Sequence, residues 1–210
     1  MPIELTTLLV FAGASLMLNL TPGPDLLYTL TRASSQGARA GIAAALGNFA
    51  GTLVQTTLIA IGLGALLAQS AVAFTTLRWV GAAYLASVGI RMILASSSAS
   101  TPDAAARRER SFRRIAVEAF LIHTLNPKVV VFFLAFLPQF VDADRGSPTL
   151  QLVLLGLWFA VQASTVLTVL SLIAGRARRA LAVRTGLGVW LRRVIGAVFV
   201  GLGGKLALTA

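Results

Sequence analysis

The sequence predicts an all-α membrane protein of six transmembrane helices, arranged as two inverted three-helix repeats whose first and fourth helices are broken. Three observations lead to this prediction. Hydrophobic residues make up 57% and charged residues only 12% of the 210 residues, and the mean hydropathy is +0.84, which is typical of a membrane-embedded chain. Two of the long apolar stretches are interrupted by proline. A short glycine-rich motif occurs once in each half of the chain.

A transmembrane helix needs about 20 consecutive apolar residues. On that scale the six predicted spans cover residues 3–31, 40–67, 77–94, 115–140, 150–174 and 189–208. Only the short polar stretch 69–76 separates the second span from the third. We expect residues 1–95 to form the first three-span repeat, residues 96–114 to form a basic cytoplasmic linker, and residues 115–210 to form the second repeat.

Most of the 18 Lys and Arg residues are gathered in three of the five predicted connections between spans. These clustered residues are Arg32, Arg39, Arg91, Arg107, Arg108, Arg110, Arg113, Arg114, Arg176, Arg178, Arg179, Arg184, Arg192 and Arg193. Because the cytoplasmic loops of membrane proteins carry the excess of positive charge, this distribution places both termini outside the cytoplasm. The formal net charge of +11 therefore indicates orientation in a lipid bilayer and not nucleic-acid binding.

The first predicted helix is interrupted by the stretch Thr21-Pro22-Gly23-Pro24-Asp25. Each proline removes a backbone donor, at about 3 kcal/mol inside a helix, and the glycine gives the chain freedom to turn. A broken backbone and a carboxylate are both costly in a bilayer unless they face protein or a watery cavity. The stretch therefore indicates a binding site. A tight turn at the membrane edge, in which Asp25 caps the next helix, is the alternative.

The fourth predicted helix carries a matching interruption, Asn126-Pro127-Lys128. Pro127 leaves a carbonyl one turn earlier without its helical donor, and the amide of Asn126 can serve such groups. Lys128 follows Arg114 by about 14 residues, or roughly 20 Å at helical rise, which is near the middle of a membrane. A lysine at that depth needs a partner. We therefore expect the two interruptions to face each other and Asp25 to share the electrostatic surroundings of Lys128.

The two halves of the chain contain similar motifs. GAAYLASVG at residues 81–89 recurs as GAVFVGLGG at residues 196–204, and the pair Leu-Gly at residues 46–47 recurs at residues 155–156. Because each half holds an odd number of predicted spans, a second copy crosses the membrane in the opposite sense. Inverted repeats of this kind give many secondary transporters two access states around one site.

Together these motifs resemble the LysE/RhtB family of bacterial amino-acid exporters. The resemblance covers essentially the whole chain and rests on TPGP at residues 21–24, GAAYL at residues 81–85, LNPK at residues 125–128, FF at residues 132–133 and LPQF at residues 137–140. It implies secondary active export of amino acids or related small metabolites across the bacterial inner membrane, driven by the proton-motive force. His123 departs from the family pattern, which often has a small amide residue shortly before the second proline motif.

The family's two proline motifs map onto Thr21 to Asp25 and onto Asn126 to Lys128. On this interpretation a zwitterionic substrate enters from the cytoplasm, and Asp25 meets its ammonium group or accepts the coupling proton. Lys128 meets the carboxylate of the substrate or keeps Asp25 ionised, and freed backbone groups of Thr21 to Pro24 and of Asn126 complete the site. The expected partners are an amino acid, a proton and the lipid bilayer, and a homo-oligomer is possible. No cofactor or metal is expected.

Other functions fit the sequence less well. An intramembrane enzyme is disfavoured, because the chain has no HExxH or GxSxG motif, one histidine and no cysteine. A metal exporter is disfavoured, because soft cations need thiolate or imidazole ligands and six-oxygen sites need several carboxylates. An exporter of another small solute or cation, or a membrane protein without a transport function, stays as the alternative.

Five further polar residues lie within predicted spans, and each has two interpretations. Asn48 and Gln55 share one face of the second span and either line the path or join helices by hydrogen bonds. Glu118 either pairs with an arginine one turn earlier or carries a proton. His123 either senses pH or bonds a carbonyl freed by proline, and Gln162 either bonds its own helix or faces the path.

Overall fold

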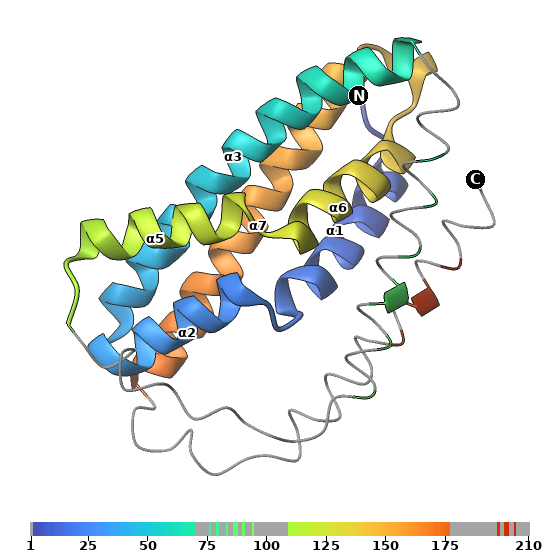
Figure 1. Cartoon of the computed structure of the whole chain (residues 1–210). Helices are drawn as coiled ribbons and strands as arrows, with labels where there is room; N and C mark the ends of the chain where they lie inside the picture. The colour runs from blue at the N-terminus through green and yellow to red at the C-terminus, as the bar shows by residue number, and fades with distance from the viewer. Residues whose placement is uncertain are drawn as a thin grey trace.

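A computed structural model of the protein is helical in the part of the chain that it describes (Figure 1). The structure describes residues 2–69 and 109–176, together with isolated positions between residues 76 and 94 and between residues 197 and 204. The elements are α1 (Leu5–Leu20), α2 (Pro24–Gln36), α3 (Ala38–Gln69), α5 (Phe112–Thr124), α6 (Pro127–Phe136), α7 (Pro148–Arg176) and the short 3-10 helices η2 (Leu137–Phe140) and η3 (Ala143–Arg145). The predicted third and sixth spans and the repeated motif within them lie outside the two continuous described ranges and stay predictions.

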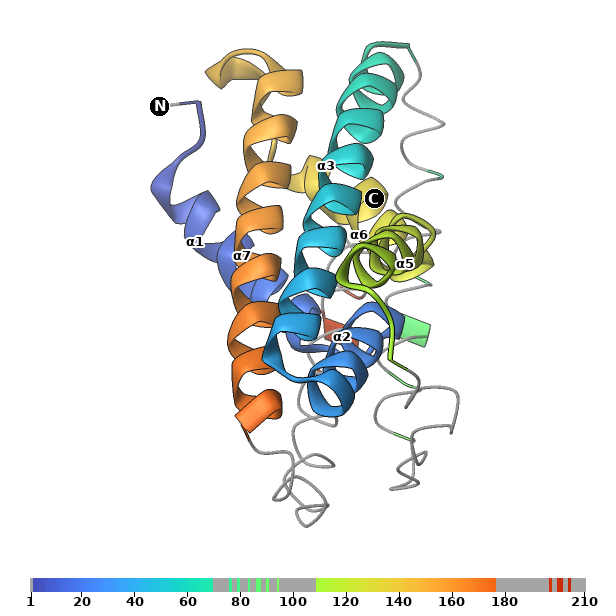
Figure 2. The same ribbon diagram turned by 90° about the vertical axis from the view of Figure 1, so that its left-hand side faces the viewer.

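The two long helices α3 and α7 lie side by side and run in opposite directions (Figures 1 and 2). Residues Ala38–Gly62 of α3 and all of α7 are long and apolar enough to cross a membrane, as the sequence predicts for residues 40–67 and 150–174. Their close approach depends on Gly156, because a Cβ atom there would lie only 2.3 Å from Thr56 Cγ2. A larger residue at this position would push the two helices apart.

Two pairs of shorter helices each form one bent segment. The axes of α1 and α2 differ by 59°, and α5 and the segment Lys128–Phe140 differ by 47°. Each pair taken together is long and apolar enough to be a broken span or a re-entrant loop, so the breaks predicted within residues 3–31 and 115–140 are confirmed. Both new helices begin with a proline, Pro24 and Pro127, because the missing N–H of proline costs no hydrogen bond at the start of a helix.

The bent segments lie against the long helices so that their breaks come close together beside the middle of α3 and α7 (Figure 1). The main core forms where α1, α6 and α7 meet, around the buried rings of Phe11, Phe132, Phe133 and Phe159. The rings of Phe133 and Phe159 pack edge to face with their centres 4.9 Å apart. Since lipid is as apolar as these side chains, close packing holds such helices together, and transfer from water does not.

The helix α5 packs on α3 through small residues. Ala40 and Ala44 of α3 and Ile115 and Ala119 of α5 form a fully buried cluster. The closest approach is at Gly47, where a Cβ atom would lie 2.1 Å from the carbonyl oxygen of Ala116. The two backbones therefore touch at this point, and no side chain fits between them.

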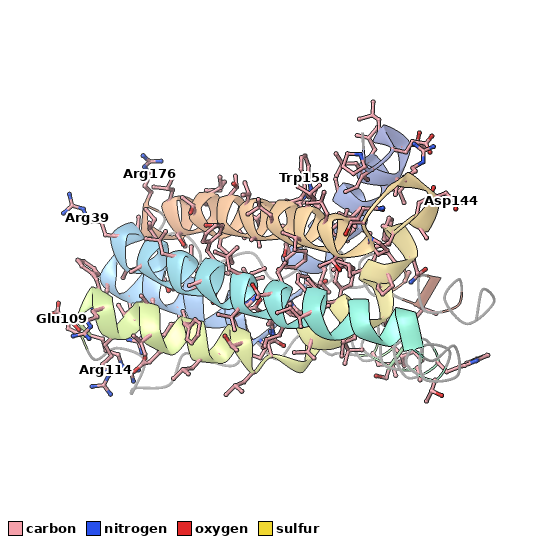
Figure 3. The ribbon with its side chains drawn as sticks, turned by 90° about the horizontal axis from the view of Figure 1, so that it is seen from above. Arg39, Glu109, Arg114, Asp144, Trp158 and Arg176 are labelled. Carbon is pink, nitrogen blue, oxygen red and sulfur yellow. The ribbon has the colours of Figure 1, made fainter. Side chains whose placement is uncertain are left out.

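Charged residues gather at the ends of the helices. Figure 3 shows Arg39, Glu109, Arg114 and Arg176 at one end of the structure and Asp144 at the other. The first end, which we call the arginine end, thus collects the start of α3, the start of α5 and the end of α7. These are positions that the sequence assigns to the cytoplasmic side.

One arginine of the predicted loop clusters has a different position. Arg32 lies within α2, is 3% exposed, and places its guanidinium 5.3 Å from the centre of the Tyr28 ring. The helix continues for one more turn, to Gln36. Asp25 is therefore further from the arginine end than its distance from Arg32 along the sequence suggests.

Candidate functional site

The two proline breaks bring an acidic and a basic side chain together inside the protein. Asp25 Oδ1 lies 3.6 Å from Lys128 Nζ, and the two side chains are only 12% and 8% exposed. Asp25 belongs to the first turn of α2 and Lys128 to the first turn of α6. Since both helices start at the breaks, bending of the two spans is what places these residues opposite each other.

Lys128 also bonds to the open end of α1. Its Nζ lies 3.2 Å from the carbonyl oxygen of Thr21 and 3.4 Å from that of Leu18, both of which lie where α1 ends. The carbonyls at the end of a helix carry a partial negative charge that stabilises a cation, and the Leu18 carbonyl bonds Lys128 in addition to accepting the Thr21 N–H at 3.1 Å. Thr21 contributes through its backbone, because its hydroxyl donates to Met17 of the preceding turn.

Gly23 lets the pair approach this closely. Its φ of −152° is ordinary extended backbone, so the freedom to turn that the sequence suggested is not what this position requires. A Cβ atom at residue 23 would instead lie 2.8 Å from Lys128 Nζ and 2.9 Å from Asp25 Oδ1. The absence of a side chain makes room for the ion pair.

His123 lies on the other side of the Asp25 carboxylate. Its Nδ1 is 3.7 Å from Asp25 Oδ2, its Nε2 is 2.9 Å from Thr52 Oγ1, and the residue is 2% exposed. Asp25 therefore lies between two nitrogen groups, the ammonium of Lys128 and the imidazole of His123. The imidazole meets a hydroxyl of α3 and not a carbonyl freed by proline.

The carbonyls freed by Pro127 are served by Gln55. Its Nε2 donates to the carbonyl of His123 at 3.2 Å and to that of Thr124 at 3.0 Å. The sequence suggested Asn126 for this task, but the side chain of Asn126 caps α6 by accepting the N–H of Lys128 at 3.0 Å. Capping by the local residue leaves the carbonyls to the longer amide of the neighbouring helix.

Asn48 reaches the site through one intermediate residue. Its Nδ2 donates to Thr29 Oγ1 at 3.3 Å, and that hydroxyl donates to the Asp25 carbonyl at 2.8 Å.

Several buried polar atoms around the ion pair have no hydrogen-bond partner among the described residues. They are Asp25 Oδ1, Asn48 Oδ1, Gln55 Oε1, His123 Nδ1, Thr124 Oγ1 and Asn126 Nδ2. Such atoms are costly unless something polar binds them, and this mixture of acceptors and donors can bind a small polar solute.

Gln162 and Glu118 lie away from the ion pair. Gln162 Nε2 donates to the carbonyl of Ala12 at 3.0 Å and its Oε1 accepts from Ser15 Oγ at 2.6 Å, so it joins α7 to α1. Glu118 pairs with Arg114 at 2.9 Å, pairs also with Arg110, and accepts the hydroxyl hydrogen of Tyr28 at 2.6 Å. Glu118 thus pairs with the arginine one turn earlier, as one of its two interpretations expected, whereas Gln162 bonds α1 and not its own helix.

Three contributors are not evident from the sequence: Thr52, Thr29 and the carbonyl of Leu18. Thr52 lies on the face of α3 that Asn48 and Gln55 define, four residues after the first and three before the second. Its helical spacing was therefore a usable signal. A backbone carbonyl carries no such signal, because only the bend of the chain exposes it.

A cavity of about 520 Å³ lies at the arginine end, lined by Gln36, Glu109, Arg110, Ser111 and Phe112. Gln36 and Arg110 also bond to each other, since Gln36 Nε2 donates to the Arg110 carbonyl at 3.0 Å and Gln36 Oε1 accepts its N–H at 3.2 Å. These bonds tie α2 to the segment that precedes α5.

In the described part of the chain, no three His, Cys, Asp or Glu side chains come together as metal ligands would.

The family model that matches the chain and the known proteins similar to it point to the same family. Residues 16–210 match the model of the LysE type translocators. The chain is 32% identical to an uncharacterized membrane protein of Vibrio cholerae over 95% of both chains, and 32% identical to the homoserine/homoserine lactone efflux protein of Salmonella typhimurium over 77% of both. It is 29% identical to the leucine efflux protein of Klebsiella pneumoniae over 95% of this chain and 93% of that one. No solved structure matches the chain. The protein therefore belongs to the LysE type translocator family, a family of membrane proteins.

Proposed function

We propose that the protein is a secondary active exporter of amino acids, or of closely related small metabolites, that works by proton antiport across the bacterial inner membrane. The observation that carries the proposal is the buried pair of Asp25 and Lys128 between two broken helices. Relatives named as leucine efflux and homoserine/homoserine lactone efflux proteins support the substrate class. A translocator family also gives no reason to expect an enzyme.

The site suits a zwitterion because, like a zwitterion, it carries one negative and one positive charge. The carboxylate of Asp25 and the ammonium of Lys128 neutralise each other. An amino acid that inserts between them would meet Asp25 with its ammonium group and Lys128 with its carboxylate. Each buried charge then keeps an opposite partner, which avoids the large cost of an unpaired charge. The unpartnered polar atoms nearby would bind the rest of the solute.

We propose that six spans form the transporter as two inverted repeats. A bent pair followed by a long helix occurs in each half, as α1 and α2 with α3 and as α5 and α6 with α7. The second set runs in the opposite sense to the first (Figure 1), which supports the inversion. Rocking of the halves against each other would give the site access to one side of the membrane at a time.

The cavity at the arginine end is the proposed entrance from the cytoplasm. Gln36 and Arg110, which bond to each other, line this cavity. The hydrogen bond from Tyr28 to Glu118 lies further along α2, on the side of Asp25. All of these bonds join α2 of the first half to α5, or to the residues just before it, in the second half. We propose that these bonds break when the two halves separate to admit the substrate.

The direct test is a comparison of extracellular amino acids in cultures with and without expression of the protein, with leucine and homoserine measured first. Export predicts accumulation outside the cell with a matching fall inside. An enzyme would instead change the chemical identity of metabolites on both sides. Equal extracellular levels in expressing and control cultures, at verified membrane abundance, would contradict the proposal.

Topology is testable with single cysteines, because the natural chain has none. We expect Asp144→Cys to react with a membrane-impermeant maleimide in intact cells, since it lies at the end opposite the arginines (Figure 3). Ser111→Cys, at the arginine end, should react only after the cells are opened. The reverse pattern would show that the arginine end faces outward.

A further inference from the structure

The imidazole of His123 contacts Thr52 with one ring nitrogen and faces Asp25 with the other. The Thr52 hydroxyl donates its single hydrogen to the carbonyl of Asn48 at 3.0 Å. Its oxygen is therefore an acceptor toward His123 Nε2, which lies 2.9 Å away. A neutral imidazole carries one hydrogen. When Thr52 bonds Asn48 in this way, the ring hydrogen lies on Nε2 and Nδ1 has a bare lone pair.

The lone pair on His123 Nδ1 faces a lone pair of the Asp25 carboxylate. His123 Nδ1 lies 3.7 Å from Asp25 Oδ2 and has no hydrogen-bond partner among the described residues. An unprotonated ring nitrogen and a carboxylate oxygen are both acceptors, so they repel until a proton lies between them. Binding of one proton changes the pair from a net charge of −1 to 0 and turns Nδ1 into a donor.

From this geometry we propose that His123 Nδ1 and Asp25 Oδ2 together bind one proton, and that this proton competes with the ammonium group of the amino acid for the Asp25 carboxylate. The inference rests on the proposed export of amino acids. It supplies what antiport requires, because a site that binds either the proton or the substrate, and not both, exchanges one for the other across the membrane. The proton is delivered by hydronium: one of its O–H bonds breaks as the N–H bond forms on Nδ1, and a water molecule is released.

The charged groups near His123 determine what competes with the proton for the Asp25 carboxylate. Asp25 faces the imidazole from α2, Lys128 lies on the far side of that carboxylate in α6, and α3 presents the neutral Thr52. Glu118, which lies in α5 with His123, is paired with Arg110 and Arg114 and accepts the Tyr28 hydroxyl hydrogen.

The transport test uses the purified full-length chain in liposomes, with equal pH on both sides and exchange of radiolabelled leucine, and homoserine as second probe. As the pH is lowered from 8 to 6, the half-saturation concentration of the wild type should rise, approaching about tenfold per pH unit because one proton competes. In His123→Asn the same change should be less than twofold. A wild-type pH dependence in His123→Asn, or none in the wild type, overturns the inference.

A second variant separates the position of the proton from the presence of the imidazole. Thr52→Val removes the acceptor for Nε2, so the neutral ring can carry its hydrogen on Nδ1 and donate to Asp25 without a further proton. The pH dependence should then weaken although His123 is intact. The matched control is Thr57→Val, because Thr57 also bonds a carbonyl one turn earlier in α3 but is exposed, away from the site. It should retain the wild-type pH profile.

A spectroscopic test does not depend on transport. Because the chain has a single histidine, NMR of protein labelled with ¹⁵N-histidine, purified without a histidine tag, reports on His123 alone. We expect the Nε2–H tautomer at high pH, protonation of Nδ1 on acidification, and a lower titration midpoint when leucine is added, since binding linkage is reciprocal. If the wild type exchanges no amino acid at any pH, the proposed function fails. The NMR tautomer then decides the proton site, which an Nδ1–H tautomer at high pH would overturn.

Discussion

Replacement of Lys128 by Ala, and separately of Asp25 by Asn, is expected to abolish amino-acid export. Each change leaves the other member of a buried ion pair without its partner, and removal of one partner of such a pair costs about 2–5 kcal/mol in binding. Because 1.4 kcal/mol corresponds to a factor of ten, even the lower limit predicts roughly a thirtyfold weaker interaction with the substrate. Efflux from amino-acid-loaded cells, at equal membrane abundance, measures the effect.

Loss of folding and loss of transport need to be separated for these variants. The double variant Asp25→Asn/Lys128→Gln has no unpaired buried charge, so it should reach the membrane at near wild-type levels and still fail to export. The control pair is Glu4 and Arg145. Their side chains are 51% and 44% exposed, and Arg145 Nη2 lies 3.2 Å from Glu4 Oε2. Since exposed pairs contribute about 0–1 kcal/mol, Arg145→Gln should export normally. Undiminished export by both single variants would remove Asp25 and Lys128 from the mechanism.

Replacement of Gly47 by Ala is expected to destabilise the protein strongly for so small a change. The added Cβ would lie 2.1 Å from the Ala116 carbonyl oxygen. That atom is backbone of α5, so it cannot rotate away, and α3 and α5 must separate. Overpacking of this kind costs about 1–3 kcal/mol, which lowers the melting temperature by roughly 2–12 °C in a chain of this size. Thermal unfolding of detergent-purified protein is the measurement.

The matched control lies on the same helix. Gly62→Ala is the identical substitution in α3, but no atom of the described residues lies within 4 Å of a Cβ atom there. It should leave the melting temperature unchanged or raise it slightly, because alanine favours a helix over glycine by about 1 kcal/mol. Equal losses in both variants would show that helix propensity, and not contact with α5, decides the outcome.

Much of the fold is legible in the sequence, because apolar length and proline position act locally. The extents of α3 and α7 follow from hydropathy, and both breaks follow from Pro22, Pro24 and Pro127. The same local reasoning misjudged Gly23, whose backbone is ordinary and whose missing side chain matters only because Lys128 approaches it from another helix. It also gave Asn126 the freed carbonyls that Gln55 serves.

By itself the sequence determined that the chain is a membrane protein, where its helices break, and that an acid and a base lie at those breaks, because each follows from residue chemistry and spacing along one segment. The tertiary structure alone decided that Asp25 lies between Lys128 and His123, and that Thr52 contacts the imidazole. These contacts join residues that are far apart in the chain. Their distances depend on how α2, α3, α5 and α6 pack, which no single segment specifies.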